Sequence, residues 1–394
     1  MNRRTFLTRS AALAAAIPAF AAPDAPFSVA EFDRTRVLRN AAKYLNDKPV
    51  TVTAAHSPRS AGGLHDFFSE GDYWWPDPKN PSGPYIQRDG MTNPGNFTGH
   101  RQFLMQLSVQ APALTAAWKL TKDRRYADHA AAHIRAWFVD EATRMNPDLQ
   151  YAQAIHGKTT GRGTGVIDTI HLVEVARAVP FLADAGSLTP ADYDTTKKWF
   201  ADYALWMTTS KNGMEERDAK NNHGTCWLMQ VAAFARLTGN RGLMADCARR
   251  YKSIVVPGQI APDGSQPLEA ARTKPYGYCL FNLEALATLC QIVSESGDNL
   301  WRFSTPETVG DHGGRGIAKA IEYMFPFIRD KKLWSKPPDV MYFEYWPMRQ
   351  EALLFAGVAY KRPDYLDLWK KLPAESDVEE VIRNYFIRQP VLWL

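Results

Sequence analysis

The sequence contains few cysteines and no pattern that would use them as ligands. Cys226, Cys247, Cys279 and Cys290 form no CxxC pair and no zinc-like spacing. All four lie in apolar segments with helical periodicity, where a thiol packs like a small hydrophobic side chain. The spacing argues against a zinc or redox motif and leaves buried thiols and a single disulfide as alternatives.

The excess of positive over negative charge is also small. The 47 Lys and Arg and 42 Asp and Glu give a formal net charge of +5, to which Arg3, Arg4 and Arg9 contribute three, so residues 22–394 carry 5 − 3 = +2. A nearly neutral chain is not typical of a nucleic-acid-binding protein, and an anionic partner would have to be held by local cations.

Residues 1–21 predict an export signal. Arg3 and Arg4 precede a short Ala-rich apolar run, and Ala19-Phe20-Ala21 fits a small-residue cleavage site. We expect a twin-arginine signal peptide at 1–21 and a periplasmic or secreted mature chain. Beyond this segment no apolar run has the length of a membrane-spanning helix, so we expect no membrane insertion after the signal is removed.

Strand signals are sparse, whereas helical periodicity dominates. Apolar residues recur at spacings of three and four; Trp227, Val231 and Phe234, for example, share one helical face. Segments with this periodicity cover 30–45, 101–119, 124–139, 168–184, 190–208, 223–238, 242–255, 277–295, 314–328, 348–360, 362–371 and 376–386.

The connections between these segments are mostly short, which favours antiparallel helix hairpins. No fixed period recurs, so a solenoid of repeats is disfavoured. We expect residues 22–394 to form one all-α domain, an α/α toroid built as an incomplete barrel of about six to seven helix hairpins with long loops over a cleft. Three long irregular stretches, 50–100, 146–167 and 257–276, are candidates for those functional loops.

Two groups of polar residues stand at predicted helix starts. Asn221, Asn222 and His223 open one helix, and Arg272, followed by Tyr276 and Tyr278, leads into another. An Asn N-cap with an incidental His, and a surface Arg with two anchoring aromatics, are the structural alternatives. Because alternate loops of a toroid meet at the same rim, we expect the two groups to share one cleft.

Two further groups lie in the long loops. Tyr73-Trp74-Trp75, with Arg59 nearby, could form a sugar-stacking platform or an aromatic plug of the toroid. Gln153, His156 and Arg162 could contact acidic sugars, and the glycines that follow would allow the backbone to approach a ligand closely; an ordinary loop is the alternative.

These residue types suit one reaction in particular. Cleavage of a 4-linked uronate by elimination removes the C5 proton, which becomes acidic only when the neighbouring carboxylate is neutralised. Amide, imidazole and guanidinium donors can neutralise it. A Tyr whose pKa is lowered by a nearby Arg could then take the proton and return one to the leaving O4. The reaction needs no metal and no other cofactor.

The chain resembles the alginate lyase superfamily, the polyuronate lyases of polysaccharide lyase families 5 and 38, over roughly residues 50–360. The resemblance is carried by Ser69–Pro78 (SEGDYWWPDP), Asn221–His223 (NNH) and the segment 272–278, and the spacing of the last two is closer to family 38.

The resemblance implies an α/α toroid and an anionic polysaccharide substrate. It also implies that Tyr278 is the catalytic base and acid, while Asn222, His223 and Arg272 neutralise the carboxylate. Tyr276 is a rival for the role of Tyr278, and His223 is a possible base for a substrate of opposite C5 configuration. β-Mannuronate and β-glucuronate differ only at C2, so these residues do not separate alginate from glucuronan.

Two other classes of function remain as alternatives. A non-catalytic glycan-binding protein would use the Trp-rich loop, but it would not need the Asn-His and Arg-Tyr groups. A glycoside hydrolase needs two carboxyl groups that flank the scissile bond. The available carboxyl groups, which form no convincing pair in the sequence, are those of Glu215, Glu216, Asp218, Glu269 and Glu344.

Overall fold

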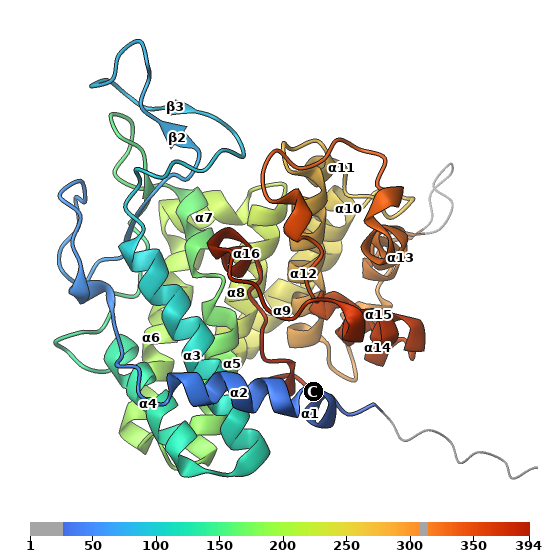
Figure 1. Ribbon diagram of the computed structural model, residues 1–394, viewed down its shortest axis with the longest axis horizontal. Coiled ribbons are helices and arrows are strands. Elements are labelled where there is room, and N and C mark those ends of the chain that lie inside the picture. Colours follow the sequence, from blue (N-terminus) through green and yellow to red (C-terminus); the bar gives the residue numbers. More distant parts are fainter. Residues whose placement is uncertain (1–26, 307–313) are drawn as a thin grey trace, which may run out of the picture.

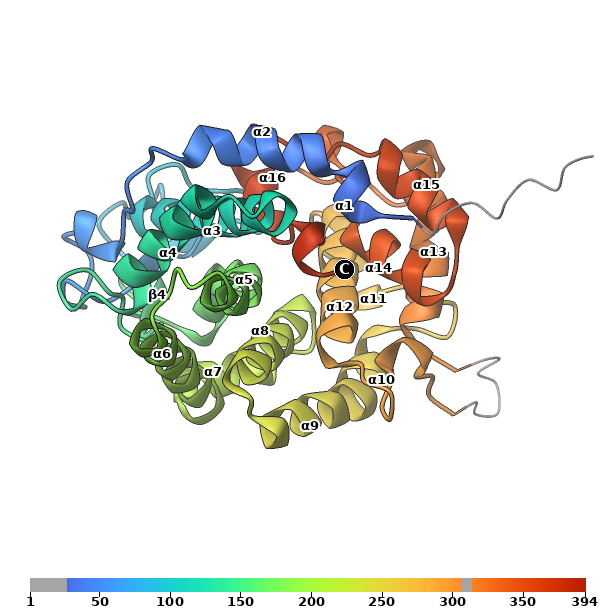
Figure 2. The same ribbon diagram turned by 90° about the horizontal axis from the view of Figure 1, so that it is seen from below.

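The structure, a computed structural model, describes residues 27–306 and 314–394. The expected signal peptide at 1–21 lies outside the described residues. Two layers of helices form a ring (Figure 2). The inner layer consists of α3 (Gly99–Thr121), α5 (Leu172–Asp184), α8 (Asn222–Thr238), α12 (Pro275–Val293) and α14 (Glu351–Ala359), each in contact with the next. The outer layer consists of α2 (Arg34–Tyr44), α4 (Arg124–Phe138), α6 (Pro190–Thr209), α9 (Arg241–Arg250), α13 (Ile317–Arg329) and α15 (Pro363–Lys371).

Composition explains which helices lie inside. Helices α8 and α12 are apolar around nearly their whole circumference and are buried over almost their full length. Helices α2 and α4, in contrast, alternate apolar and charged residues and bury only one face. The layering therefore follows from how far the apolar surface extends around each helix.

Short elements fill the connections. The remaining helices are α1 (Val29–Phe32), α7 (Lys211–Arg217), α10 (Val256–Gln259), α11 (Pro267–Ala270) and α16 (Glu379–Asn384), with a π-helical turn at Tyr251–Val255. Short 3₁₀ turns lie at Val52–Ala54, Gly163–Thr169, Leu300–Arg302, Lys331–Leu333, Phe343–Tyr345 and Pro390–Leu392.

Four short strands accompany the long loops. Strand β1 (Phe68–Glu70) pairs in parallel with β4 (Tyr151–Ala154), and β2 (Trp74–Trp75) pairs antiparallel with β3 (Ile86–Gln87). The β2–β3 pair belongs to an arm that projects beyond one end of the ring (Figure 1). This arm carries the Tyr-Trp-Trp run to the end of the ring where helices α8 and α12 begin.

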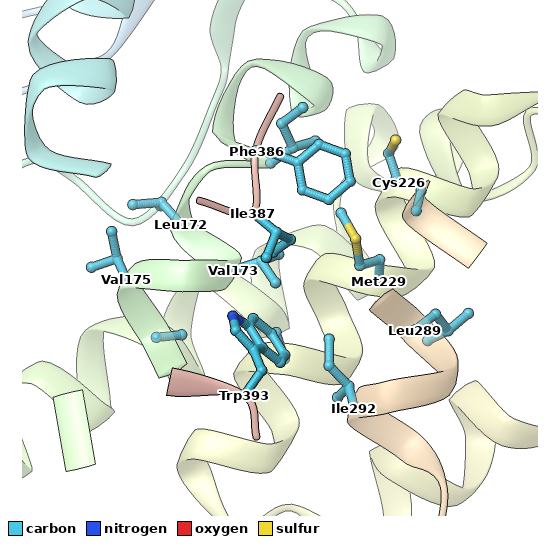
Figure 3. Close-up of a cluster of buried hydrophobic side chains, with 14 of the residues drawn as sticks. Leu172, Val173, Val175, Cys226, Met229, Leu289, Ile292, Phe386, Ile387 and Trp393 are labelled. Atoms are coloured by element: carbon cyan, nitrogen blue, oxygen red, sulfur yellow. The ribbon is translucent and has the colours of Figure 1, made fainter. Parts of the chain in front are cut away.

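The C-terminal segment, residues 385–394 after α16, fills the centre of the ring. Phe386, Ile387 and Trp393 pack among side chains of α5, α8 and α12 (Figure 3). The buried carboxylate of Glu174 on α5 accepts backbone N–H groups of Arg388 and Gln389 at 3.0 and 2.7 Å. The centre of the ring is therefore filled by protein.

The fold agrees with the expectation of an all-α toroid, and the periodic segments predicted most helix bounds to within a few residues. The sequence did not predict the short helices α7, α10 and α11 inside the connections. All four cysteines are buried and unpaired. Among the described residues, no helix is long and apolar enough to cross a membrane.

Candidate active site

The first turn of α8 places Asn222 and His223 at one end of the ring. Asn221 is the N-cap, and its side-chain oxygen accepts the backbone N–H of His223 at 3.3 Å. The next position, 224, requires glycine, because a Cβ there would lie 2.1 Å from the carbonyl oxygen of Ala219. The string Asn-Asn-His-Gly is thus a capped, tightly packed helix start.

Asn222 is fixed by a buried carboxylate. Its backbone N–H donates to Oε1 of Glu269 at 2.6 Å and its side-chain amide donates to Oε2 at 2.7 Å. Burial raises the pKa of Glu269, although the two bonds from Asn222 oppose the shift. Glu269 lies on α11, just before Arg272, so this contact ties the start of α8 to the loop that carries the guanidinium. Asn222 is 1% exposed, so this contact fixes a buried amide.

His223 is oriented by a carboxylate that the sequence did not single out for this role. Its Nδ1 lies 2.6 Å from Oε1 of Glu216 on α7, and the imidazole keeps about a fifth of its surface exposed (20%). Burial pushes the pKa of His223 down, but the attraction of Glu216 outweighs it and the pKa is raised above its ordinary value. With Nδ1 engaged, Nε2 is the nitrogen available to a substrate.

The start of α12 positions Tyr278. The carboxylate of Asp339 accepts the backbone N–H groups of Tyr276 and Gly277, each at 2.8 Å. A Cβ on Gly277 would lie 2.7 Å from that carboxylate, so only glycine permits the cap. Tyr278 follows one residue later and directs its phenol toward Arg272 and Tyr73.

The phenol of Tyr278 has two polar neighbours. Arg272 donates from Nη2 at 3.2 Å, with its guanidinium carbon 4.3 Å from the centre of the phenol ring, and the Tyr73 hydroxyl lies at 2.9 Å. Burial raises the pKa of Tyr278, Arg272 and Tyr73 oppose it, and the result is about 12. The expectation that Arg272 lowers this pKa overall was wrong, because burial of the phenol exceeds the attraction.

Arg272 itself is held by the carboxylate of Asp89. Asp89 accepts its Nη2 and Nε at 2.9 and 3.4 Å, and the Thr273 hydroxyl donates to the same carboxylate at 3.0 Å. Burial would raise the pKa of Asp89, but the bond and charge of Arg272 lower it. Arg272 also lies close enough to His223 to oppose protonation of the imidazole. The same guanidinium thus donates to the phenol at the start of α12 and acts electrostatically on the imidazole at the start of α8.

The segment Ser69–Pro78 is mainly a support for Tyr73. Ser69 donates to Asp168 at 2.5 Å, and Asp72 is paired with Arg101 and Arg383 at 2.5 and 2.9 Å. All of these groups are buried or nearly so. The acidic residues of the motif thus anchor the loop, and the Tyr73 hydroxyl is the part that reaches the Tyr278 phenol.

The rest of the Trp-rich loop is covered by cations. Arg162 and Lys158 lie 5.9 and 5.0 Å from the ring centre of Trp74, and Arg88 lies 5.0 Å from that of Trp75. Both indoles are half-buried. Cations stacked on the rings place positive charge beside the aromatic faces that a sugar would contact.

A groove of about 340 Å³ runs beside this loop, and Arg59 and His156 line it. Arg59 is paired with Glu70 at 2.5 Å, so its charge is balanced. His156 is exposed and stacks against Tyr85, with ring centres 5.2 Å apart. These two residues therefore lie at the edge of the site, away from the phenol.

Gln153 and Arg162 form a connected pair beneath the loop. Arg162 donates to the side-chain oxygen of Gln153 at 2.7 Å, and Gln153 donates to Asp168 at 3.2 Å. Gln153 is 5% exposed and has a left-handed backbone conformation at φ 51°. Gln153 is thus a support, whereas Arg162, which forms no ion pair within the described part of the chain, can still bind an anion.

Two expectations are corrected. Tyr276 is fully buried, donates to the Phe327 carbonyl at 3.0 Å and packs against Trp334 and Phe343, so it neither binds substrate nor competes with Tyr278. The glycines at 161, 163 and 165 contact the protein's own chain, because a Cβ at each would lie within 2.8 Å of a neighbouring residue. They serve packing, since no space for a ligand remains beside them.

Glu216, Asp89 and Tyr73 complete the site through tertiary contacts. Tyr73 was expected to contact sugar, but its contact with Tyr278 was not foreseen. Glu216 and Asp89 had no local signal: each is one acidic residue among many, and only the fold brings it to its partner. The available clue was chemical, since a half-buried His and Arg require counter-charges.

The comparisons with known proteins identify the family of the chain. Residues 51–334 match the alginate lyase family, which is more than half of the chain. The chain belongs to the alginate lyase family. It is therefore a polysaccharide lyase, and its candidate site lies inside the matched region. The sequence matches no curated protein.

Solved structures support the same assignment. A crystal structure of an alginate lyase from Bacteroides ovatus matches this lyase with a TM-score of 0.79 and 31% identity, over 92% of this chain and 93% of that one. Alginate lyase A1-III from Sphingomonas species A1 matches with a TM-score of 0.53 and 16% identity, over 93% and 94%. A variant of alginate lyase A1-III complexed with a tetrasaccharide gives 0.55 and 15%, also over 93% and 94%. The last two likenesses concern the fold alone.

Proposed function

We propose that this lyase cleaves a 4-linked polyuronate, of the alginate or glucuronan type, by β-elimination. The observation that carries the proposal is the position of Arg272, which donates to the Tyr278 phenol at 3.2 Å and whose charge opposes protonation of the His223 imidazole. Donors for a carboxylate and a phenol for the adjacent C–H bond are thus present in one site.

The reaction follows from these positions. Asn222, His223 and Arg272 bind the uronate carboxylate, so that negative charge can develop on it when C5 loses its proton. Tyr278, as phenolate, takes this proton, the C4–O4 bond breaks, and a C4=C5 double bond forms. The new Tyr278 O–H then protonates O4, which lies on the same face in β-mannuronate and β-glucuronate.

Tyr73 supports the phenolate. Burial raises the pKa of Tyr73 well above its ordinary value, so it keeps its proton and donates to the Tyr278 oxygen. Arg272 supplies positive charge on the other side. These two contacts favour the phenolate and oppose the effect of burial on the pKa of Tyr278, which still rises to about 12.

The carboxyl groups argue against a glycosidase. A glycosidase needs two acids that face the scissile bond. The carboxylate of Glu216 binds His223, and that of Glu269 binds Asn222. Asp218 forms ion pairs with Arg217 and Arg250. Glu215 is paired with Lys211, and Glu344 lies on the exposed surface.

The test is the appearance of unsaturated product from polymannuronate, polyguluronate, glucuronan and glycosaminoglycans, followed by ultraviolet absorbance. We expect product from at least one polyuronate, and a loss of at least about a thousandfold in kcat in Tyr278→Phe. Tyr345→Phe, which changes an exposed tyrosine, should retain full activity. Saturated products, or an active Tyr278→Phe variant, would refute the mechanism.

We also propose that residues 1–21 direct export to the periplasm through the twin-arginine route. The support is the Arg3-Arg4 pair and the apolar run that follows it. Replacement of both arginines by lysine should retain the full-length chain in the cytoplasmic fraction, and unchanged export would contradict the proposal.

A further inference from the structure

A second cavity lies at the opposite end of the ring from Tyr278. It measures about 460 Å³, and its walls come from α5, α8, α12 and the C-terminal segment. Arg236 in its wall stands 14 residues after Asn222 on α8, which corresponds to about 21 Å along the helix. The packed C-terminal segment separates the two ends, and Trp393, Val173 and Ile292 form part of both the packed centre and the cavity wall (Figure 3).

Two guanidiniums line this cavity. Arg177 from α5 donates from Nε to the Leu392 carbonyl at 2.7 Å, and Arg236 from α8 donates from Nη1 to the Ile292 carbonyl. Neither forms an ion pair within residues 27–306 and 314–394, and neither has a guanidinium nitrogen among the buried atoms without a partner. Arg236 is exposed and Arg177 is half-buried, and both line the cavity.

The guanidiniums are close enough to repel each other. Burial lowers the pKa of Arg177, and the charge of Arg236 lowers it further. Each is held by a carbonyl, and Arg177 also lies 5.6 Å from the ring centre of Trp393. Two cations held by carbonyls, neither in an ion pair within the part of the chain that the structure describes, constitute a site that an anion would stabilise.

The other walls suit a sugar. Tyr193 and Trp393 contribute aromatic rings, and Gln291 and Ser294 contribute polar side chains. Lys197 lies 5.3 Å from the ring centre of Tyr193, which is part of this wall. Aromatic faces with nearby hydrogen-bond donors are the features that bind pyranose rings.

We propose that this cavity is a second binding site for short acidic oligosaccharides, with carboxylates bound between Arg177 and Arg236. The choice of ligand rests on the proposed function, because uronate oligosaccharides are the products that accumulate around such an enzyme. The site lies too far from Tyr278 to take part in catalysis and binds independently of it.

The test is calorimetric titration of a uronate trimer into the full-length mature protein carrying Tyr278→Phe, which prevents cleavage. We expect two binding events. Addition of Arg236→Gln should weaken one of them at least about tenfold and leave the other unchanged. Arg241→Gln, which removes an exposed arginine of neighbouring α9, should leave both unchanged.

The outcomes separate the two proposals. If only the Arg236-dependent binding event is observed, the proposed active site is contradicted and the second site is not. A single event that Arg236→Gln does not affect would overturn the second site. Inorganic phosphate that binds in an Arg236-dependent manner while the trimer does not would also overturn it. Because Arg236 is exposed, its variant should fold; Arg236→Lys, which retains the charge, should restore part of the affinity.

Discussion

At the scale of single residues, the proposed site depends on pairs in which an acid holds a group that we propose binds the substrate. Glu216 holds His223, Glu269 holds Asn222, and Asp89 holds Arg272. Each acid fixes the orientation of a donor. Glu216 also changes the protonation of its partner, which makes its role measurable separately from packing.

We predict that Glu216→Gln lowers the pKa of His223. The carboxylate now raises this pKa against burial, so its removal leaves burial and the charge of Arg272, both of which disfavour the imidazolium. If the protonated imidazole neutralises the substrate carboxylate, the fall of kcat/KM on the alkaline side should begin at least about one pH unit lower. The pH profile and titration of the ring signals by NMR measure this shift.

The matched control is Glu215→Gln. Glu215 lies on the same short helix, but it is exposed and 3.8 Å from Lys211. Its replacement should move neither the profile nor the His223 signals. An unchanged profile in Glu216→Gln would mean that His223 acts as a neutral donor.

At the scale of elements, the starts of helices carry the chemistry, and close packing determines where they start. Gly224 lets the first turn of α8 lie against the Ala219 carbonyl, and Gly277 lets Asp339 cap α12. Close packing thus explains why a glycine follows His223 and why a glycine precedes Tyr278.

We predict that Gly224→Ala destabilises the protein by about 1–3 kcal/mol, because the new Cβ would lie 2.1 Å from a backbone oxygen. It should also lower kcat, since His223 would move with the turn. Gly242→Ala is the control: its Cβ would meet nothing closer than 3.6 Å, so it should stabilise α9 by about 0.5–1 kcal/mol. Urea unfolding measures both; equal effects would refute the packing argument.

A buried carboxylate between α12 and α14 should make stability depend on pH. Glu284 accepts the first backbone N–H groups of α14, from Glu351 and Ala352, both at 3.1 Å. Burial raises its pKa from 4.5 to about 8, although these bonds oppose the shift. The folded state therefore retains a proton that the unfolded state loses.

We predict that the unfolding free energy contributed by Glu284 is fully present below pH 4.5 and is lost as the pH rises to about 8. The slope for one proton is at most about 1.4 kcal/mol per pH unit. Glu284→Gln cannot ionise and should flatten the dependence between these limits. Urea unfolding at several pH values tests this; parallel curves for the two proteins would contradict it.

At the scale of the whole molecule, the C-terminal segment joins distant parts of the ring. It fills the centre, contacts three inner helices and separates the two ends (Figures 1 and 3). Glu174 and Arg177 of α5 bind its backbone, through Arg388 and Leu392 respectively. The stability of the toroid should therefore depend on this segment as much as on the helix hairpins.

We predict that Leu392→Ala lowers the free energy of unfolding by about 2–5 kcal/mol. Leu392 is fully buried, and the packed helices around it cannot move in to fill the space that the lost side-chain atoms leave. Leu205→Ala removes the same atoms from a side chain that is 61% exposed and should cost less than about 0.5 kcal/mol. Similar midpoints of denaturation for the two variants would show that the segment is not part of the cooperative core.

Much of this organisation could be read from the order of residues alone. Apolar spacing located the principal helices, because a helix must bury a continuous stripe whatever its neighbours are. The groups at 221–223 and 272–278 indicated a site for an acidic sugar, because the chemistry of elimination needs those side chains. Local physical constraints were sufficient for the helices, whereas the site for an acidic sugar stays a prediction.

Tertiary structure decided the rest, since the deciding contacts join residues far apart in the chain. The resemblance favoured Tyr278 and left Tyr276 as a rival, until the fold buried Tyr276 and placed the Tyr278 phenol within hydrogen-bond distance of Arg272. The pKa of that phenol rose because burial depends on every element packed around it. The partnership of Glu216 with His223, and the cavity between Arg177 and Arg236, likewise exist only where separate helices meet.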